Sequence, residues 1–200
     1  VRNTPDMPAA SSIAQANRLG GFDFYLALHS NAAAPESSGS VRGVLVFYYP
    51  TSAEGKRAAD LFAANLKRVY PLPDLVRTVP TTALGEVRQP KYPANLLELG
   101  YHDNYADAAW VENNMDAIAR ELARSLTEYF GLPFIEPQPV VQGTVSTSGS
   151  PLRLRAYPSA AGQTIALMPN GASVTVYGTW QGWNTVEYNG NLGYAAEAYI

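Results

Sequence analysis

The stretch Ala94-Asn95-Leu96-Leu97-Glu98-Leu99-Gly100 decides the fold class of this 200-residue chain. It is a nearly continuous apolar run, interrupted by one acid, which is typical of a strand covered on both faces. After it, apolar residues recur at spacings of three and four from Ala106 to Phe130, and Gly131-Leu132-Pro133 then ends the segment. This spacing predicts a helix over residues 106–130.

The same alternation of strand and helix is found towards the N-terminus. Phe22–Leu28 and Val44–Tyr49 are apolar runs that predict two further strands, the second of them β-branched and aromatic. Residues 9–20 predict a short helix that ends at a glycine pair, and Thr51–Glu54 opens another helix with a capping-box pattern. We therefore predict an α/β domain with a mostly parallel sheet flanked by helices.

The composition of the chain changes after Phe134. Residues 137–150 are rich in proline, glycine and hydroxyl side chains, which predicts a linker between two domains. Beyond it, short β segments alternate with turn signals such as Asn189-Gly190, and no helical period remains. The sequence thus predicts a first domain over residues 1–136, a linker over 137–150 and a small all-β barrel over 151–200.

Charge and composition argue against several kinds of protein. The formal net charge is −3, which argues against nucleic acid as a partner because neutralising phosphates requires clustered Lys and Arg. No run approaches the roughly 18 apolar residues that a membrane span needs. The chain has no cysteine, so disulfides and thiolate metal sites are excluded, and a soft metal would have to use the two histidines with carboxylates.

His29 and Glu98 stand out because each is an ionisable residue at the C-terminal end of an apolar strand. In open α/β sheets ligands bind at that edge, so the two residues predict a joint site. A histidine and a carboxylate suit metal-assisted hydrolysis, in which one holds the metal and the other takes a proton from the metal-bound water. The residues alone leave a plainer interpretation open, namely a hydrogen-bonded structural histidine and a solvent-facing strand-end glutamate.

Two motifs resemble those of the zinc-dependent N-acetylmuramoyl-L-alanine amidases. The first is Tyr25-Leu26-Ala27-Leu28-His29-Ser30-Asn31-Ala32, and the second is Pro93-Ala94-Asn95-Leu96-Leu97-Glu98-Leu99-Gly100-Tyr101-His102-Asp103-Asn104. The resemblance runs from Val1 to about Phe134 and implies an amidase/aminopeptidase-like fold. It implies that His29 is a zinc ligand and that Glu98 is the catalytic acid/base.

The chain departs from this family at one point. In the family, a second histidine and a glutamate from an opening strand and helix complete the zinc site, and the resemblance places that unit before Val1. We therefore expect the 200 residues alone to bind zinc weakly, and either a dimer or a separate N-terminal fragment to cover the open sheet edge. His102 follows the second motif at a position where the family has no ligand. We therefore expect His102 to be either a rim residue of the site or a structural residue, and Asn31 and His102 are our candidates for contact with substrate.

The tail carries a second resemblance. Leu152–Ser159 and Gly182–Val186 are similar to motifs of bacterial Src-homology-3-type domains. The resemblance covers Gly143–Ile200 and implies binding of peptidoglycan or its stem peptides. The charged residues of this module are few: Arg153, Arg155, Glu187 and Glu197. Aromatic and polar contacts should therefore dominate its binding, and Trp183 and Tyr194 are expected to touch the ligand.

Both resemblances together lead to one main hypothesis. They imply a secreted or wall-bound bacterial peptidoglycan hydrolase that cleaves the amide bond between N-acetylmuramic acid and L-alanine with zinc-activated water. The alternative is a non-catalytic peptidoglycan-binding or regulatory protein that retains the amidase fold. The missing zinc ligands favour the alternative, whereas the intact motifs around His29 and Glu98 oppose it. A plain adhesion module without catalytic ancestry is disfavoured by the specificity of both motifs.

Overall fold

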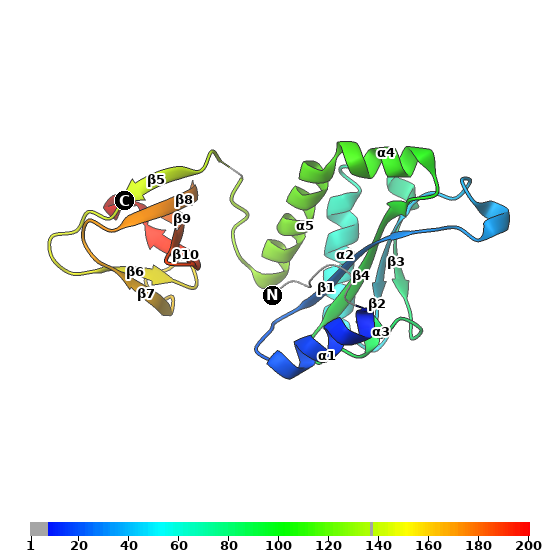
Figure 1. Cartoon of the computed structure of the whole chain (residues 1–200), viewed down its shortest axis with the longest axis horizontal. Helices are drawn as coiled ribbons and strands as arrows, with labels where there is room; N and C mark the ends of the chain where they lie inside the picture. The colour runs from blue at the N-terminus through cyan, green and yellow to red at the C-terminus, as the bar shows by residue number, and fades with distance from the viewer. Residues whose placement is uncertain (1–7, 137) are drawn as a thin grey trace. The chain divides into compact units, whose positions relative to one another are not determined.

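A computed structural model describes residues 8–136 and 138–200 of the chain. The chain divides into two compact units, one that ends at Gly131 and one from Leu132 to Ile200 (Figure 1). Within the two described ranges, no helix combines the length and the apolar character needed to cross a bilayer.

The first unit is built on a four-stranded sheet. Its strand order is β1 (Tyr25–Asn31), β4 (Ala94–Tyr101), β2 (Val44–Tyr48) and β3 (Val76–Pro80). Strand β1 is parallel to β4 and β2 is parallel to β3, whereas β2 and β4 are antiparallel. The predicted α/β class with a mostly parallel sheet is confirmed, and the single antiparallel pair makes the sheet mixed.

Helices cover both faces of this sheet (Figure 1). The α-helices are α1 (Ala9–Leu19), α2 (Ala53–Leu66), α3 (Gly85–Arg88), α4 (Tyr105–Asn113) and α5 (Met115–Phe130), and two short 3-10 turns are η1 (Pro35–Ser37) and η2 (Pro73–Leu75). The N-cap of α2 is Ser52, whose side chain accepts a hydrogen bond from the backbone N–H of Gly55 at 3.0 Å. Thr51, which the capping-box pattern placed in this role, lies one residue before the cap.

The sequence predicted one helix over residues 106–130, but the structure has two. Asn114 has φ −128° and ψ 23°, which is outside the helical region, so α4 ends before it and α5 begins after it. The Asn114 side chain donates to the Trp110 carbonyl at 2.8 Å, and its own carbonyl accepts from the Ile118 amide at 2.9 Å. The apolar spacing continues through the break because both helices bury residues in one core, which is why periodicity alone missed it.

The main core lies between one face of the sheet and helices α2 and α5. It includes Val44, Val46 and Leu97 from the strands, and Phe62, Leu66, Ile118 and Leu122 from the helices. Strand residues alternate between the two faces, so the neighbours of these residues point to the other side. That second face holds a smaller cluster of Ala27, Leu96 and Val87, the last from α3. Helix α1 packs against α3.

The second unit is an antiparallel all-β domain. Its strand order is β5 (Val141–Thr144), β8 (Ser173–Trp180), β9 (Trp183–Tyr188), β10 (Asn191–Ala196), β6 (Leu152–Arg155) and β7 (Thr164–Met168), with a closing 3-10 turn η3 (Glu197–Tyr199). The predicted Asn189-Gly190 turn joins β9 to β10, and both residues have positive φ, at 50° and 74°. Such angles define the two-residue hairpin turn that this dipeptide favours.

One part of the predicted linker belongs to this domain instead. The sequence predicted a linker over residues 137–150, but Val141–Thr144 form β5, which pairs with β8, and Val145 is buried in the core. The surrounding proline, glycine and serine residues masked a short β-branched strand. The proposed boundary therefore needs to be moved towards the N-terminus.

Candidate active site

His29 and Glu98 lie opposite each other on neighbouring parallel strands, β1 and β4. Residues in register on adjacent strands point to the same face, and here it is the face that carries Ala27 and Leu96 and that α3 covers. Both strands continue beyond the two residues, to Asn31 and Tyr101. The side chains thus project from the sheet face near its carboxyl edge rather than from the strand ends.

Glu98 is a half-buried acid of the site. Its Oε2 atom is buried and has no hydrogen-bond partner within the described residues. Burial raises the pKa of Glu98 above its ordinary value, and the nearby His29 and His102 only partly oppose this effect. A carboxyl group with a raised pKa and one free oxygen is suited to taking up and releasing a proton.

Glu86 is a third ionisable residue at this site, and the sequence analysis did not identify it. Its Oε2 lies 2.9 Å from His29 Nε2, and its Oε1 accepts a hydrogen bond from the Tyr25 hydroxyl at 3.1 Å. Glu86 is 8% exposed, whereas the His29 side chain is 42% exposed. The carboxylate of Glu86 therefore fixes the orientation of the His29 ring from the buried side. No sequence signal marked it, since it lies in a four-residue helix 57 residues away from His29.

His102 and Asn31 lie just beyond this pair. His102 Nδ1 and Ser30 Oγ form a hydrogen bond of 3.1 Å, and the His102 amide donates to the Asn31 carbonyl at 2.9 Å. The Asn31 side chain accepts from the Ala32 amide at 2.9 Å. His102 is exposed and Asn31 is half-buried. Their contact with substrate stays a prediction.

The turn after β4 anchors the long loop that joins β1 to β2. The Asp103 carboxylate accepts from the amides of Ala33 and Gly39 at 3.2 and 3.1 Å. The Asn104 side chain donates to the Gly39 carbonyl at 2.6 Å. These bonds hold residues 33–39 against the turn that follows Glu98.

Asp107 anchors the far end of the same loop. Its Oδ1 accepts from Arg42 Nε at 2.8 Å and from the Tyr70 hydroxyl at 2.7 Å, while its Oδ2 accepts from the amides of Gly43 and Tyr101 at 3.0 and 3.1 Å. Burial alone would raise the pKa of Asp107, but these hydrogen bonds outweigh it and hold the pKa below its ordinary value. Asp107 is thus an ionised, fully paired structural residue.

The described residues do not complete a metal site. Among residues 8–136 and 138–200, no group of three or more His, Cys, Asp and Glu side chains is arranged to hold a metal ion. His29 Nε2 is already within hydrogen-bond distance of Glu86. A catalytic zinc site uses three protein ligands, so the zinc that the family resemblance implies does not fit these residues alone.

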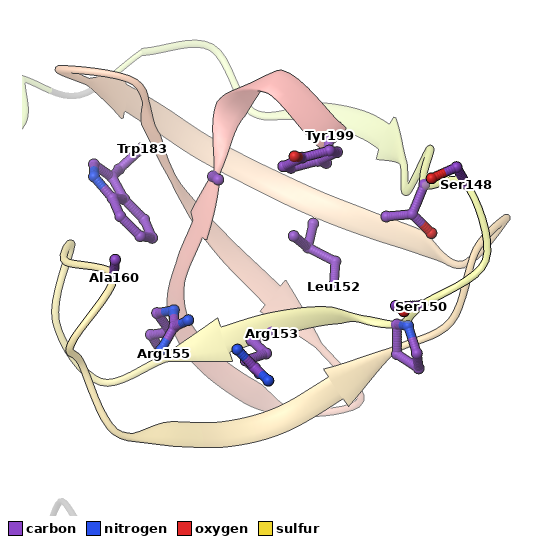
Figure 2. A pocket seen from close by; sticks show the side chains of 11 residues that line it. Ser148, Ser150, Leu152, Arg153, Arg155, Ala160, Trp183 and Tyr199 are labelled. Carbon is purple, nitrogen blue, oxygen red and sulfur yellow. The ribbon is translucent and has the colours of Figure 1, made fainter.

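The two aromatic residues predicted to bind ligand lie in the second unit, in different surroundings. Trp183 lines a groove of about 450 Å³ (Figure 2), whereas Tyr194 is not among the lining residues, and burial raises its pKa. Tyr199 lines the same groove and is 47% exposed, and the sequence analysis did not select it. A ligand role for Tyr194 has no support from this geometry.

A comparison with protein families gives two matches. Residues 1–128 match N-acetylmuramoyl-L-alanine amidase (Amidase_3), and residues 150–200 match the bacterial SH3 domain (SH3_3). A comparison with curated proteins gave no match.

Solved structures with a similar fold are amidases and an endolysin. The catalytic domain of the CD27L endolysin, which targets Clostridioides difficile, has a TM-score of 0.51 and 24% identity and covers 60% of this chain and 61% of its own. The CwlD amidase of Clostridioides difficile, solved with the GerS lipoprotein, has a TM-score of 0.54 and 16% identity, covering 61% and 63%. AmiC2 of Nostoc punctiforme has a TM-score of 0.52 and 19% identity, covering 62% and 67%. The chain thus spans about three fifths to two thirds of the length of these proteins.

Proposed function

Because this chain belongs to the N-acetylmuramoyl-L-alanine amidase family and carries a bacterial SH3 domain, we propose that it is a peptidoglycan hydrolase with Glu98 as its acid/base. The bond cleaved would join the lactyl group of N-acetylmuramic acid to the L-alanine of the stem peptide. The SH3 domain would hold the protein on the wall, which makes it a secreted or wall-bound protein. The observation that carries the proposal is the buried, unpaired Oε2 of Glu98 beside His29.

The role of Glu98 follows from its surroundings. Amide hydrolysis needs a group that removes a proton from the attacking water and then delivers one to the departing amine nitrogen. Burial raises the pKa of Glu98 towards the range in which one carboxyl can do both. Its Oε2 keeps an unused hydrogen-bonding capacity, because no neighbouring side chain of the described residues pairs with it.

The role of His29 is that of an oriented imidazole on the same face. Glu86 lies 2.9 Å from its Nε2 on the buried side, and this contact favours one orientation of the ring. The family resemblance assigns zinc to this histidine, and a zinc ligand role for His29 is part of the proposal. We assign no reaction step to the metal, since the described residues do not complete its site.

A second candidate function is supported by that same incomplete site. A protein with one oriented histidine and no three-ligand group in its described residues would suit a peptidoglycan-binding or regulatory role. The unpaired Glu98 argues against it. A purely structural glutamate buried in this way would be costly unless something paired with it.

Replacing Glu98 by Gln tests the proposal. The amide keeps the shape of the side chain but cannot transfer the proton, so hydrolysis of a soluble muropeptide by the natural protein should fall about a hundredfold or more. Glu112→Gln is the matched control, because Glu112 is an exposed acid on α4, and its rate should be unchanged. Near-normal turnover in Glu98→Gln would remove the acid/base role from Glu98, whereas no turnover in the wild-type protein would leave the binding function as the better account.

A further inference from the structure

The groove in the second unit has features of a built ligand site. It measures about 450 Å³, within the range of roughly 300–1,000 Å³ that is common for small-ligand sites. Trp183 and Ala160 lie at one end, Ser148 and Ser150 at the other, and Arg153 and Arg155 lie along β6 between them (Figure 2). The groove is therefore apolar at one end, polar at the other and basic in its middle.

The two arginines are the distinctive part of this groove. They are two residues apart on β6, so they project to the same side of the strand about 7 Å apart along it. Arg155 Nη1 donates to the Gly162 carbonyl at 2.7 Å, which holds this guanidinium in place. In the part of the chain that the structure describes, neither arginine is paired with a carboxylate and no acidic residue lines the groove.

An unpaired guanidinium favours a specific kind of occupant. Its planar fork matches the two oxygens of a carboxylate and binds them with two parallel hydrogen bonds. A long polyanion is disfavoured, because residues 150–200 hold two basic residues, Arg153 and Arg155, against two acidic ones, Glu187 and Glu197. The charge is local, and it suits one or two carboxylates rather than a charged polymer.

The remaining walls favour a short peptide beside that carboxylate. Trp183, Tyr199 and Leu152 offer apolar and aromatic surface for small side chains. Thr147 Oγ1 is buried at the groove wall and has no hydrogen-bond partner within the described residues, which favours a polar group next to it. A peptide backbone supplies such polar groups at regular intervals, whereas an apolar ligand does not.

We propose that this groove binds a short peptide through its free C-terminal carboxylate, which Arg153 and Arg155 receive while Trp183 and Tyr199 cover the preceding residues. Peptidoglycan stem peptides that end in D-alanine belong to this class. The inference rests on the proposed wall-binding function of the SH3 domain and names the part of the wall that this domain recognises.

The test compares one peptide with its own amide. The full 200-residue chain is titrated with L-Ala-γ-D-Glu-L-Lys-D-Ala-D-Ala and with the same peptide amidated at its C-terminus, by calorimetry. Wild type should bind the free acid at least about tenfold more tightly than the amide, because only the acid carries the forked acceptor at its C-terminus, whereas both peptides share the α-carboxylate of D-Glu. Arg153→Gln should remove most of this difference. Arg155→Lys keeps the charge without the fork and should lose part of it.

Three controls make the result decisive. Arg77→Gln removes an exposed arginine on β3 of the other unit and should bind the acid like wild type. Circular dichroism of each variant reports whether the β-domain remains folded, and Arg153, which has no structural partner in the described residues, is the safer of the two substitutions. Glycan strands stripped of peptide serve as the competing ligand.

Equal binding of acid and amide, or tight binding of the stripped glycan instead, would overturn the carboxylate inference. Co-sedimentation of wild-type protein with intact peptidoglycan is measured in parallel. Sedimentation without discrimination between acid and amide would leave the wall-binding function standing and remove only this inference. Discrimination between acid and amide without sedimentation would leave the carboxylate inference standing and remove the wall-binding function.

Discussion

The two units of this chain bury different kinds of side chain. In the amidase unit, Asp107, Glu86 and Asn95 are buried among the apolar residues, and Glu98 holds a buried oxygen. The SH3-type unit has a core of aliphatic residues and methionine, and its charged residues lie outside that core. Burial raises the pKa of a carboxyl group and so favours an acid/base role, whereas recognition of a soluble ligand requires charges that remain accessible. The placement of charge therefore separates a unit suited to chemistry from a unit suited to binding.

The sharpest way to test this contrast is to neutralise the best-paired buried acid. Asp107→Asn should destabilise the first unit by about 4 kcal/mol, because the amide nitrogen would face donors and the Arg42 charge would lose its partner. Hydrogen exchange measured peptide by peptide should show faster exchange in the first unit alone. Equal acceleration in residues 150–200 would show that the two units are not independent.

The Asp107 carboxylate also makes the stability of the first unit depend on pH. The pKa of Asp107 in the folded protein is below its ordinary value of 3.8, so its stabilising contribution is complete above that pH. As pH falls through the lowered folded pKa, this contribution is lost. The stability difference between wild type and Asp107→Asn should therefore be constant near neutrality and shrink in acid, as urea unfolding at a series of pH values would show.

The matching test in the second unit shortens a side chain of its core. Leu154 is fully buried in the aliphatic cluster, and Leu154→Ala should cost about 3 kcal/mol through lost burial and the cavity left behind. Exchange should now accelerate in the β-domain and not around β4. If protection of β4 also fell, the idea of two separate cores would be wrong.

A smaller effect is expected at the start of α2. Ser52→Ala removes the side-chain acceptor for the Gly55 amide and should cost about 1 kcal/mol. Asp60→Asn serves as control, because the Lys56–Asp60 pair on the same helix is exposed and should contribute less than the cap. Thermal unfolding of the two variants should rank them in this order.

In the first unit, the sequence predicted β1, β2 and β4 and the pair His29 and Glu98. Long apolar runs can be recognised as strands without knowledge of their partners in the sheet. It missed β3, a short strand that contains Arg77 and ends at Pro80, and it missed β5 among proline and glycine residues. Both strands are defined by their partners in the sheet more than by their own composition.

Only those residues of the candidate site that lie in a recognisable local sequence pattern could be predicted. Glu86 belongs to it because the chain returns across the sheet face after β3, and a four-residue helix leaves no periodic pattern. In the second unit, Trp183 was identified from its motif, but Tyr199 lines the groove because η3 folds back to the segment after β5, where the Ser146 amide donates to the Tyr199 carbonyl at 2.9 Å. Such proximity is a property of topology and cannot be derived from neighbours in sequence.

The anchored loop between β1 and β2 has a consequence for protein engineering. Asp103, Asn104 and Asp107 hold it at Ala33, Gly39 and Gly43, and η1 lies between the first two of these points. We expect that Pro35–Ser37 can be exchanged for other sequences of equal length while the three anchor points are kept. A library restricted to this segment would vary the loop beside the turn that follows β4 while its anchoring bonds are kept.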